Sequence, residues 1–219
     1  MYRARLTISA TGLGDMTNTD RHLDGVYGAK SAQDIALQYD AWSEDYEGDL
    51  AQAGYRQPSI ATALCARYLP SGAAPILDAG AGTGLMGEWL HLIGYPEIEA
   101  LDISEGMLAV AKKKGVYSAL HQRALGDDLP FEDGRFAGVV CAGVFTTGHV
   151  GVEALQELVR CTAKLGVLIL TVKEKLWAGE VSESLARFDL EILEATQPYI
   201  SMPGAPSATP SRAVALRHI

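Results

Sequence analysis

Residues 76–84 read Ile-Leu-Asp-Ala-Gly-Ala-Gly-Thr-Gly, and this stretch decides the fold. The apolar residues at its start are typical of a buried strand, and the three alternating glycines let the backbone turn sharply and approach a ligand closely. Residues 85–90 then carry apolar side chains at helical spacing. We therefore expect a strand, a glycine loop and a helix, with the loop at the carboxyl end of a parallel sheet, where such sheets bind ligands.

Strand and helix patterns continue to alternate after this unit. Strands are expected at 98–102, 116–120, 136–144 and 167–172, with helices at 104–114 and 152–162. This alternation predicts an α/β fold with a parallel sheet. Two further strands are expected at 190–200 and 213–218, and because no helix joins them they can pair antiparallel.

The chain before the glycine loop is expected to be helical. One helix face carries residues at spacings of four, three, four and four, namely Ile35, Tyr39, Trp42, Tyr46 and Leu50. A second helix begins near Pro58 and ends before Pro70. Residues 1–30 have no such pattern, so we expect a flexible tail there and a single domain at 31–219, whose residues 31–70 form a helical cap.

Composition excludes several classes of protein. The 219 residues include 18 Lys and Arg against 27 Asp and Glu, and the resulting net charge of −9 argues against a nucleic-acid partner. Hydrophobic residues make up 48%, enough for a core, and no apolar run approaches the ~18 residues that cross a bilayer. The three cysteines form no CxxC pair, so we expect no disulfide framework and no metal site, and a cytoplasmic location fits.

Two kinds of nucleotide ligand fit a glycine loop of this type. Residues 82–87 match the GxGxxG pattern of dinucleotide-binding folds, and Asp102 lies near the position of their ribose-binding acid. An NAD(P)-dependent oxidoreductase is therefore one candidate, although the sequence has no Tyr-x-x-x-Lys pair. Asp78 argues against this candidate, because a carboxylate at the strand end suits a cationic ligand group better than a pyrophosphate.

Four motifs together resemble a known family. They are Asp78-x-Gly80-x-Gly82-x-Gly84 followed by Asp102, Leu129-Pro130-Phe131-Glu132-Asp133-Gly134-Arg135-Phe136, the helical segment 154–160, and Tyr39-Asp40-x-Trp42-x-x-x-Tyr46. This combination resembles the class I S-adenosylmethionine-dependent methyltransferases of the small-molecule branch, and is similar to the methyltransferase-like 27 (Williams–Beuren region) group. The resemblance runs from about residue 31 to the C-terminus. It implies a Rossmann-like fold with a mostly parallel seven-stranded sheet, an antiparallel C-terminal strand, helices on both faces and an N-terminal helical lid.

The resemblance also implies a cofactor, S-adenosylmethionine, with S-adenosylhomocysteine as the product. Asp102 should then accept hydrogen bonds from both ribose hydroxyls, and Asp78 should orient the loop and the ammonium group. The residues expected under the amino acid moiety are Gly80, Gly82 and Gly84. Those expected around the adenine are Ile103, Met107 and, through its backbone, Leu125, because Ala124 replaces the acid that usually contacts the adenine amine.

Aromatic residues are expected to close the site over the methionine end. Tyr39 and Trp42 carry this expectation, because aromatic faces suit a sulfonium, although the same stripe also fits plain helix packing. Cys141, at the end of an expected strand, is a further candidate for contact with the cofactor, with core packing as the competing interpretation.

The chemistry of the methyl acceptor is left open by the sequence. His149 lies in the loop after the strand at 136–144 and is a candidate general base, while a surface or helix-capping role is the alternative. We expect methyl transfer to an O, N or S atom of an unidentified small molecule, by a monomer or a weak homodimer. A non-catalytic protein that binds S-adenosylmethionine or S-adenosylhomocysteine is the second interpretation.

Overall fold

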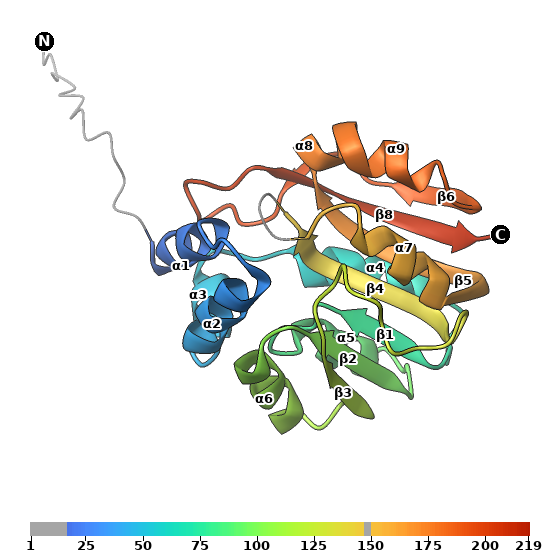
Figure 1. Ribbon diagram of the computed structural model, residues 1–219, viewed down its shortest axis with the longest axis horizontal. Coiled ribbons are helices and arrows are strands. Elements are labelled where there is room, and N and C mark those ends of the chain that lie inside the picture. Colours follow the sequence, from blue (N-terminus) through green and yellow to red (C-terminus); the bar gives the residue numbers. More distant parts are fainter. Residues whose placement is uncertain (1–16, 147–149) are drawn as a thin grey trace, which may run out of the picture.

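The computed structural model describes residues 17–146 and 150–219. At its centre is a sheet with the strand order β3-β2-β1-β4-β5-β8-β6, and a short β7 pairs with β8 outside this path (Figure 1). The strands are β1 (Ile76–Ala79), β2 (Ile98–Asp102), β3 (Ala119–Gln122), β4 (Phe136–Phe145), β5 (Thr162–Lys173), β6 (Leu190–Ala195), β7 (Tyr199–Ile200) and β8 (Pro210–His218).

The strand directions confirm the expected fold class. Neighbouring strands from β3 to β5 are parallel, whereas β8 is antiparallel to β5, β6 and β7. The described part of the sheet has eight strands rather than seven, because the strand expected at 190–200 is divided into β6 and β7. Pro198 lies in the break and has no N–H to donate to a neighbouring strand. The strand expected at 116–120 is β3, which begins later, at Ala119.

Helices cover both faces of the sheet. They are α4 (Gln57–Tyr68), α5 (Leu85–Leu92), α6 (Glu105–Lys113), α7 (Ala154–Cys161), α8 (Glu174–Leu176), the π-helical turn η1 (Trp177–Val181) and α9 (Ser182–Leu185). Alternate residues of β1 face opposite sides, so Leu77 packs in a core with Leu155 of α7, whereas Ile76 packs in another with Leu64 of α4 and Leu90 of α5. This alternation gives a three-layer α/β fold.

Three short helices precede the sheet: α1 (Asn18–Tyr27), α2 (Ala32–Trp42) and α3 (Tyr46–Gln52). Figure 1 shows them grouped beyond the end of β4. The single helix expected through Leu50 is broken between α2 and α3, where the Ser43 hydroxyl donates to the carbonyl of Asp40 (2.9 Å). The apolar stripe nevertheless converges, because Trp42 and Leu50 pack with Met202 from the loop between β7 and β8.

Helix α1 lies inside the segment that was expected to be a flexible tail. A capping box between Thr17 and Asp20 starts the helix, and Asp20 also accepts a hydrogen bond from Ser207 (2.5 Å). The Thr19 hydroxyl donates to the carbonyl of Asp49 (3.0 Å), so α1 is held by side-chain contacts to α3 and to the C-terminal loop. The expected tail therefore overlaps a folded helix from residue 18, while residues 1–16 lie outside the described part.

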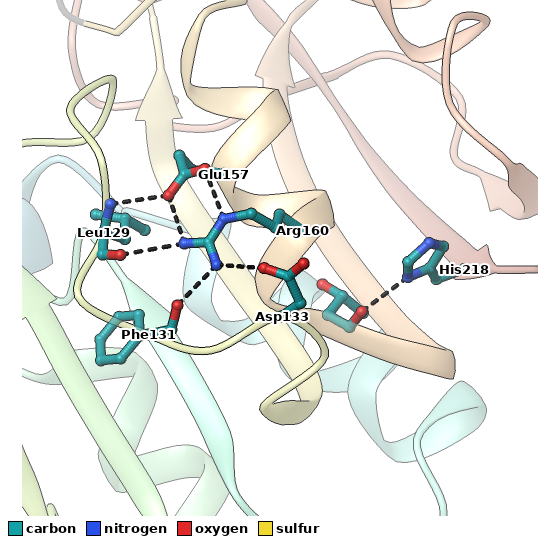
Figure 2. Close-up of polar contacts among 7 residues, drawn as sticks. Leu129, Phe131, Asp133, Glu157, Arg160 and His218 are labelled. Carbon is teal, nitrogen blue, oxygen red and sulfur yellow. Dashed lines mark hydrogen bonds and ion pairs between the residues drawn. The ribbon is translucent and has the colours of Figure 1, made fainter.

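Arg160 on α7 holds the Leu129–Asp133 segment, which leads into β4 (Figure 2). Its guanidinium donates to the carbonyls of Phe131 (2.7 Å) and Leu129 (3.1 Å) and pairs with Glu157 and Asp133. Glu157 also accepts the N–H of Leu129 (2.8 Å). Through this network one arginine ties the segment 129–133 to helix α7, so the 129–136 and 154–160 motifs are in direct contact.

Among the described residues, no helix combines the length and the apolar character required to cross a membrane.

Candidate functional site

A crevice opens at the carboxyl ends of β1, β2 and β4, under helix α2. It holds about 760 Å³ of space free of atoms, counting the part open to solvent. Its walls come from α2, from the glycine loop, from the end of β2 and the following helix, from residues 123–125 and from the end of β4. This is the position at which open α/β sheets bind their ligands.

The glycine loop forms the floor of the crevice. Gly80 has φ +78°, a backbone conformation that residues with a side chain rarely adopt. A Cβ built on it would also lie 2.2 Å from Cγ2 of Val144, so there is no space for a side chain. Gly82 has φ +54°, and its N–H donates to the Asp102 carboxylate (2.8 Å). Backbone therefore lies directly against the crevice at both positions.

Asp102 ends β2 and faces the crevice while it is 9% exposed. Its two oxygens accept the N–H groups of Gly82 (2.8 Å) and Ser104 (2.9 Å), which fixes the orientation of the carboxylate. Burial raises the pKa of Asp102, and these hydrogen bonds oppose the rise. A carboxylate offers about four lone-pair sites, so two remain to accept donors from a ligand.

Asp78 lies next to the crevice but does not line it. The carboxylate is buried and accepts a hydrogen bond from the Tyr117 hydroxyl (2.6 Å). Burial is the main reason that the pKa of Asp78 rises to about 7. The Tyr117 ring occupies the space beside Gly87, where a Cβ would lie 2.2 Å from it. Direct contact between Asp78 and a ligand ammonium is therefore not supported by this geometry, and the residue instead anchors Tyr117 behind the loop.

The remaining candidates divide into two groups. Those that line the crevice together with Gly80, Gly82 and Asp102 are Tyr39, Ile103, Met107 and Leu125. Those that do not are Gly84, Trp42 and Cys141. A Cβ on Gly84 would meet Tyr117 at 2.9 Å, so this glycine packs against a side chain. Cys141 is fully buried in the sheet core, and burial raises the pKa of its thiol. His149 lies outside the described residues.

Trp42 was expected over the methionine end, and its placement differs. Its side chain is 1% exposed, and its indole N–H donates to Asp49 (2.8 Å) inside the group of N-terminal helices. The ring packs edge-on against Tyr46, with 4.7 Å between the ring centroids. Tyr46, which the sequence placed in the helix stripe and at the end of the Tyr39–Tyr46 motif but not at the cofactor, lines the crevice, whereas Trp42 does not.

Asp40 fixes helix α2 over the crevice, and sequence reasoning assigned it no role beyond its motif. Its carboxylate accepts hydrogen bonds from the Ser104 hydroxyl (2.5 Å) and from the N–H of Gly106 (2.8 Å) at the start of α6. A Cβ on Gly106 would lie 3.0 Å from Cα of Asp40, so the absence of a side chain permits this close approach. Ser104 also caps α6, so one residue links the helix cap to α2.

A second pocket adjoins the crevice, and the two share Tyr39, Tyr46 and Gly143. Its other lining residues come from all three N-terminal helices, the segment after α3, the ends of β4 and β5 and the loop after β7: Leu23, Tyr27, Trp42, Leu50, Tyr55, Gln57, Thr146, Lys173, Ser201 and Met202. This second pocket was not predicted, because its lining residues are scattered along the chain and share no motif.

Comparisons with known proteins agree with the resemblance seen in the motifs. Residues 77–170 match a family model described as a methyltransferase domain. The chain is 36% identical over 138 residues to methyltransferase-like protein 27 of Homo sapiens, a match that covers 62% of this chain and 56% of that protein. It is 32% identical over 124 residues to dTDP-3-amino-3,6-dideoxy-alpha-D-glucopyranose N,N-dimethyltransferase of Streptomyces fradiae, covering 50% of this chain and 46% of that one. These matches span about half the length of each relative.

A solved structure supports the same fold. The structure of an S-adenosylmethionine dependent methyltransferase from Mesorhizobium loti superposes with a TM-score of 0.55 at 16% identity, covering 72% of this chain and 98% of that chain. At this level of identity the match bears on the fold alone.

Proposed function

We propose that this chain, whose residues 77–170 match a methyltransferase domain, is a class I S-adenosylmethionine-dependent methyltransferase that transfers a methyl group to a small-molecule acceptor. The observation that carries the proposal is the crevice in which the bare backbone of Gly80 and Gly82 faces the Asp102 carboxylate. Such a crevice combines room for a nucleoside with an acceptor for a vicinal diol.

The residues present fit this cofactor. Asp102 keeps two lone-pair sites for the ribose hydroxyls after its two backbone hydrogen bonds. Ile103, Met107 and Leu125 offer apolar surface on the side of Asp102 where the adenine would lie. Gly80 would face the amino acid moiety, because its backbone lines the crevice. Tyr39 and Tyr46 would present aromatic surface to the sulfonium, an arrangement that attracts a cation.

The proposed chemistry is a direct displacement. When bound, the cofactor supplies an electrophilic methyl carbon on a sulfonium and leaves as a neutral thioether, S-adenosylhomocysteine. The lone pair of the acceptor atom forms the new bond to carbon as the carbon–sulfur bond breaks, and a protic acceptor loses its proton to a base or to water. The protein's contribution is alignment and exclusion of water, since the reaction needs no further electrophile. His149 stays a candidate base.

The second pocket favours a small acceptor. It adjoins the crevice and is lined mainly by aromatic and apolar side chains, with about 400 Å³ of space free of atoms when the part open to solvent is counted. The relative from Streptomyces fradiae is named for methylation of a nucleotide-linked amino sugar, which is also a small molecule. The net charge of −9 disfavours nucleic acid as the acceptor.

The proposal is tested by incubating the protein with S-adenosylmethionine that carries a trideuterated methyl group and with a mixed extract of small metabolites. We expect S-adenosylhomocysteine to accumulate and at least one metabolite to gain the mass of the labelled methyl group. The Asp102→Ala variant should lose most of this signal, whereas Asp127→Ala, on an exposed loop, should keep it. If the protein binds S-adenosylhomocysteine but labels nothing, including added protein and RNA, it is a non-catalytic binder.

A further inference from the structure

Lys173 is the one charged side chain among the described residues that line the second pocket. It ends β5, is 7% exposed, and donates to the carbonyl of Thr209 (3.2 Å). No carboxylate pairs with it in the described ranges, 17–146 and 150–219; its neighbour Glu174 is paired with Arg212 instead. A buried ammonium with only one backbone acceptor is unusual, because buried charges are normally paired.

Ser201 is an independent sign that the second pocket takes a polar ligand. The residue is 1% exposed and lines the same pocket, and its hydroxyl has no hydrogen-bond partner among the described residues. A buried hydroxyl without a partner costs free energy, so such groups are commonly completed by a ligand or an ordered water. Two polar groups that lack full partners, one of them cationic, therefore line one pocket whose other lining side chains are mainly aromatic and apolar.

We propose that the second pocket binds the methyl acceptor by a carboxylate, with the Lys173 ammonium and the Ser201 hydroxyl as its anchors. The inference rests on the proposed function, and it specifies the acceptor as a small organic acid. One ammonium matches a single negative charge, whereas a phosphate dianion would require further cations that the described lining lacks.

The surroundings of Lys173 support this assignment. Burial lowers the pKa of Lys173, so an incoming anion would stabilise the charged form and be held by it. The body of the acid would lie between the rings of Tyr27, Tyr39 and Tyr55, which line the same pocket. Tyr39 and Gly143 also line the crevice, so the body of the acid would extend toward the methyl group. Lys173 is thus a specificity-determining residue in this proposal.

The test compares acids with their uncharged counterparts. Acetate, benzoate and phenylacetate, each beside its primary amide, are titrated into the protein saturated with S-adenosylhomocysteine, and binding is followed by calorimetry. We expect at least one acid to bind ten-fold or more tightly than its amide. Lys173→Met should reduce that preference to less than three-fold, while Lys173→Arg should retain it because the charge is kept.

Lys175→Met is the matched control, since this exposed lysine lies two residues away and outside the pocket, and it should leave the preference unchanged. All variants should bind S-adenosylhomocysteine as the unmodified chain does, which shows that they are folded. The inference is overturned if no acid is preferred over its amide, or if the preference survives Lys173→Met. Failure of the proposed function would look different, because the unmodified chain would then either not bind S-adenosylhomocysteine or bind it without labelling any metabolite in the methyl-transfer assay.

Discussion

Individual residues of the glycine loop have distinct physical roles. Gly80 and Gly82 bring bare backbone to the crevice, whereas Gly84 and Gly87 leave room for Tyr117. The motif alone could not separate these roles, because all the glycines sit in one short segment. What separates them is Tyr117, which is distant in sequence and reaches back to Asp78. A motif position therefore does not by itself imply contact with the ligand.

Asp78 should make stability depend on pH in the direction opposite to that of an ion-paired carboxylate. Its pKa is about 7 in the folded protein against 3.8 for the unperturbed group, so between these values the folded state holds a proton that the unfolded state has lost. Its contribution to stability is thus complete below about pH 4 and disappears as the pH rises through 7. On lowering the pH from 8 to 5, we expect the wild type to gain about 2 kcal/mol in unfolding free energy relative to Asp78→Asn.

Urea unfolding of both proteins across this range provides the measurement. Asp128→Asn, which alters an exposed carboxylate, is the control and should follow the wild type. Parallel pH profiles for wild type and Asp78→Asn would show that the carboxylate titrates normally and that its burial is compensated.

At the level of elements, α2 and α3 contribute to the crevice wall, and α1 packs against them outside it. Helix α2 contributes Ile35 and Tyr39 to the crevice wall, and Asp40 ties it to the start of α6. Helix α1 has no residue in that wall and is held instead by Thr19 and Asp20. A ligand in the crevice would therefore contact α2 directly and α1 only through its neighbours.

Hydrogen exchange should reveal this difference. With S-adenosylhomocysteine bound, we expect amide exchange in 32–42 to slow about ten-fold or more, while exchange at 139–141 in β4 changes little. Without ligand, Asp40→Ala should speed exchange in α2, because the bonds to Ser104 and Gly106 are lost. Asp45→Ala is the matched control, since Asp45 is exposed and makes no side-chain cap bond to α3. If α2 is already as protected as β4 without ligand, the helix is part of the core.

Some of the helices and strands were predicted from the sequence, and others were not. The alternation of strands and helices predicted the parallel sheet and its antiparallel end, because burial on both faces leaves continuous apolar runs. The break between α2 and α3 and the helix α1 were not predicted. Their packing uses partners far along the chain, Met202 for the aromatic stripe and Ser207 for Asp20, although the Ser43–Asp40 bond at the break and the capping box of α1 are local.

The residues of the candidate site, like the elements of the fold, were predicted only in part. The family resemblance placed Ile103 and Met107 around the adenine, and both line the crevice, since the end of β2 and the start of α6 lie at its wall. Lys173 and Ser201 were missed, since their significance depends on a pocket assembled from distant segments. One signal could have drawn attention to Lys173, namely that it is the first charged residue after the mostly apolar run 167–172.

For the molecule as a whole, the crevice and the second pocket adjoin and together form the proposed site. The crevice presents backbone and a carboxylate to a nucleoside, and the second pocket presents one cation and one unpartnered hydroxyl, with Tyr39, Tyr46 and Gly143 between them. In this account α2 and α3 contribute residues to both spaces, whereas α1 contributes to the second pocket alone.

The central claim, that the crevice is built for S-adenosylmethionine, is tested most directly by isothermal titration of the unmodified protein with S-adenosylhomocysteine and, separately, with NADH. The account predicts micromolar binding of S-adenosylhomocysteine and no measurable binding of NADH. Asp102→Ala should weaken the former by ~2–4 kcal/mol, because the ribose hydroxyls lose their charged acceptor, while Asp127→Ala should change nothing. Tight binding of NADH without any response to S-adenosylhomocysteine would contradict the account.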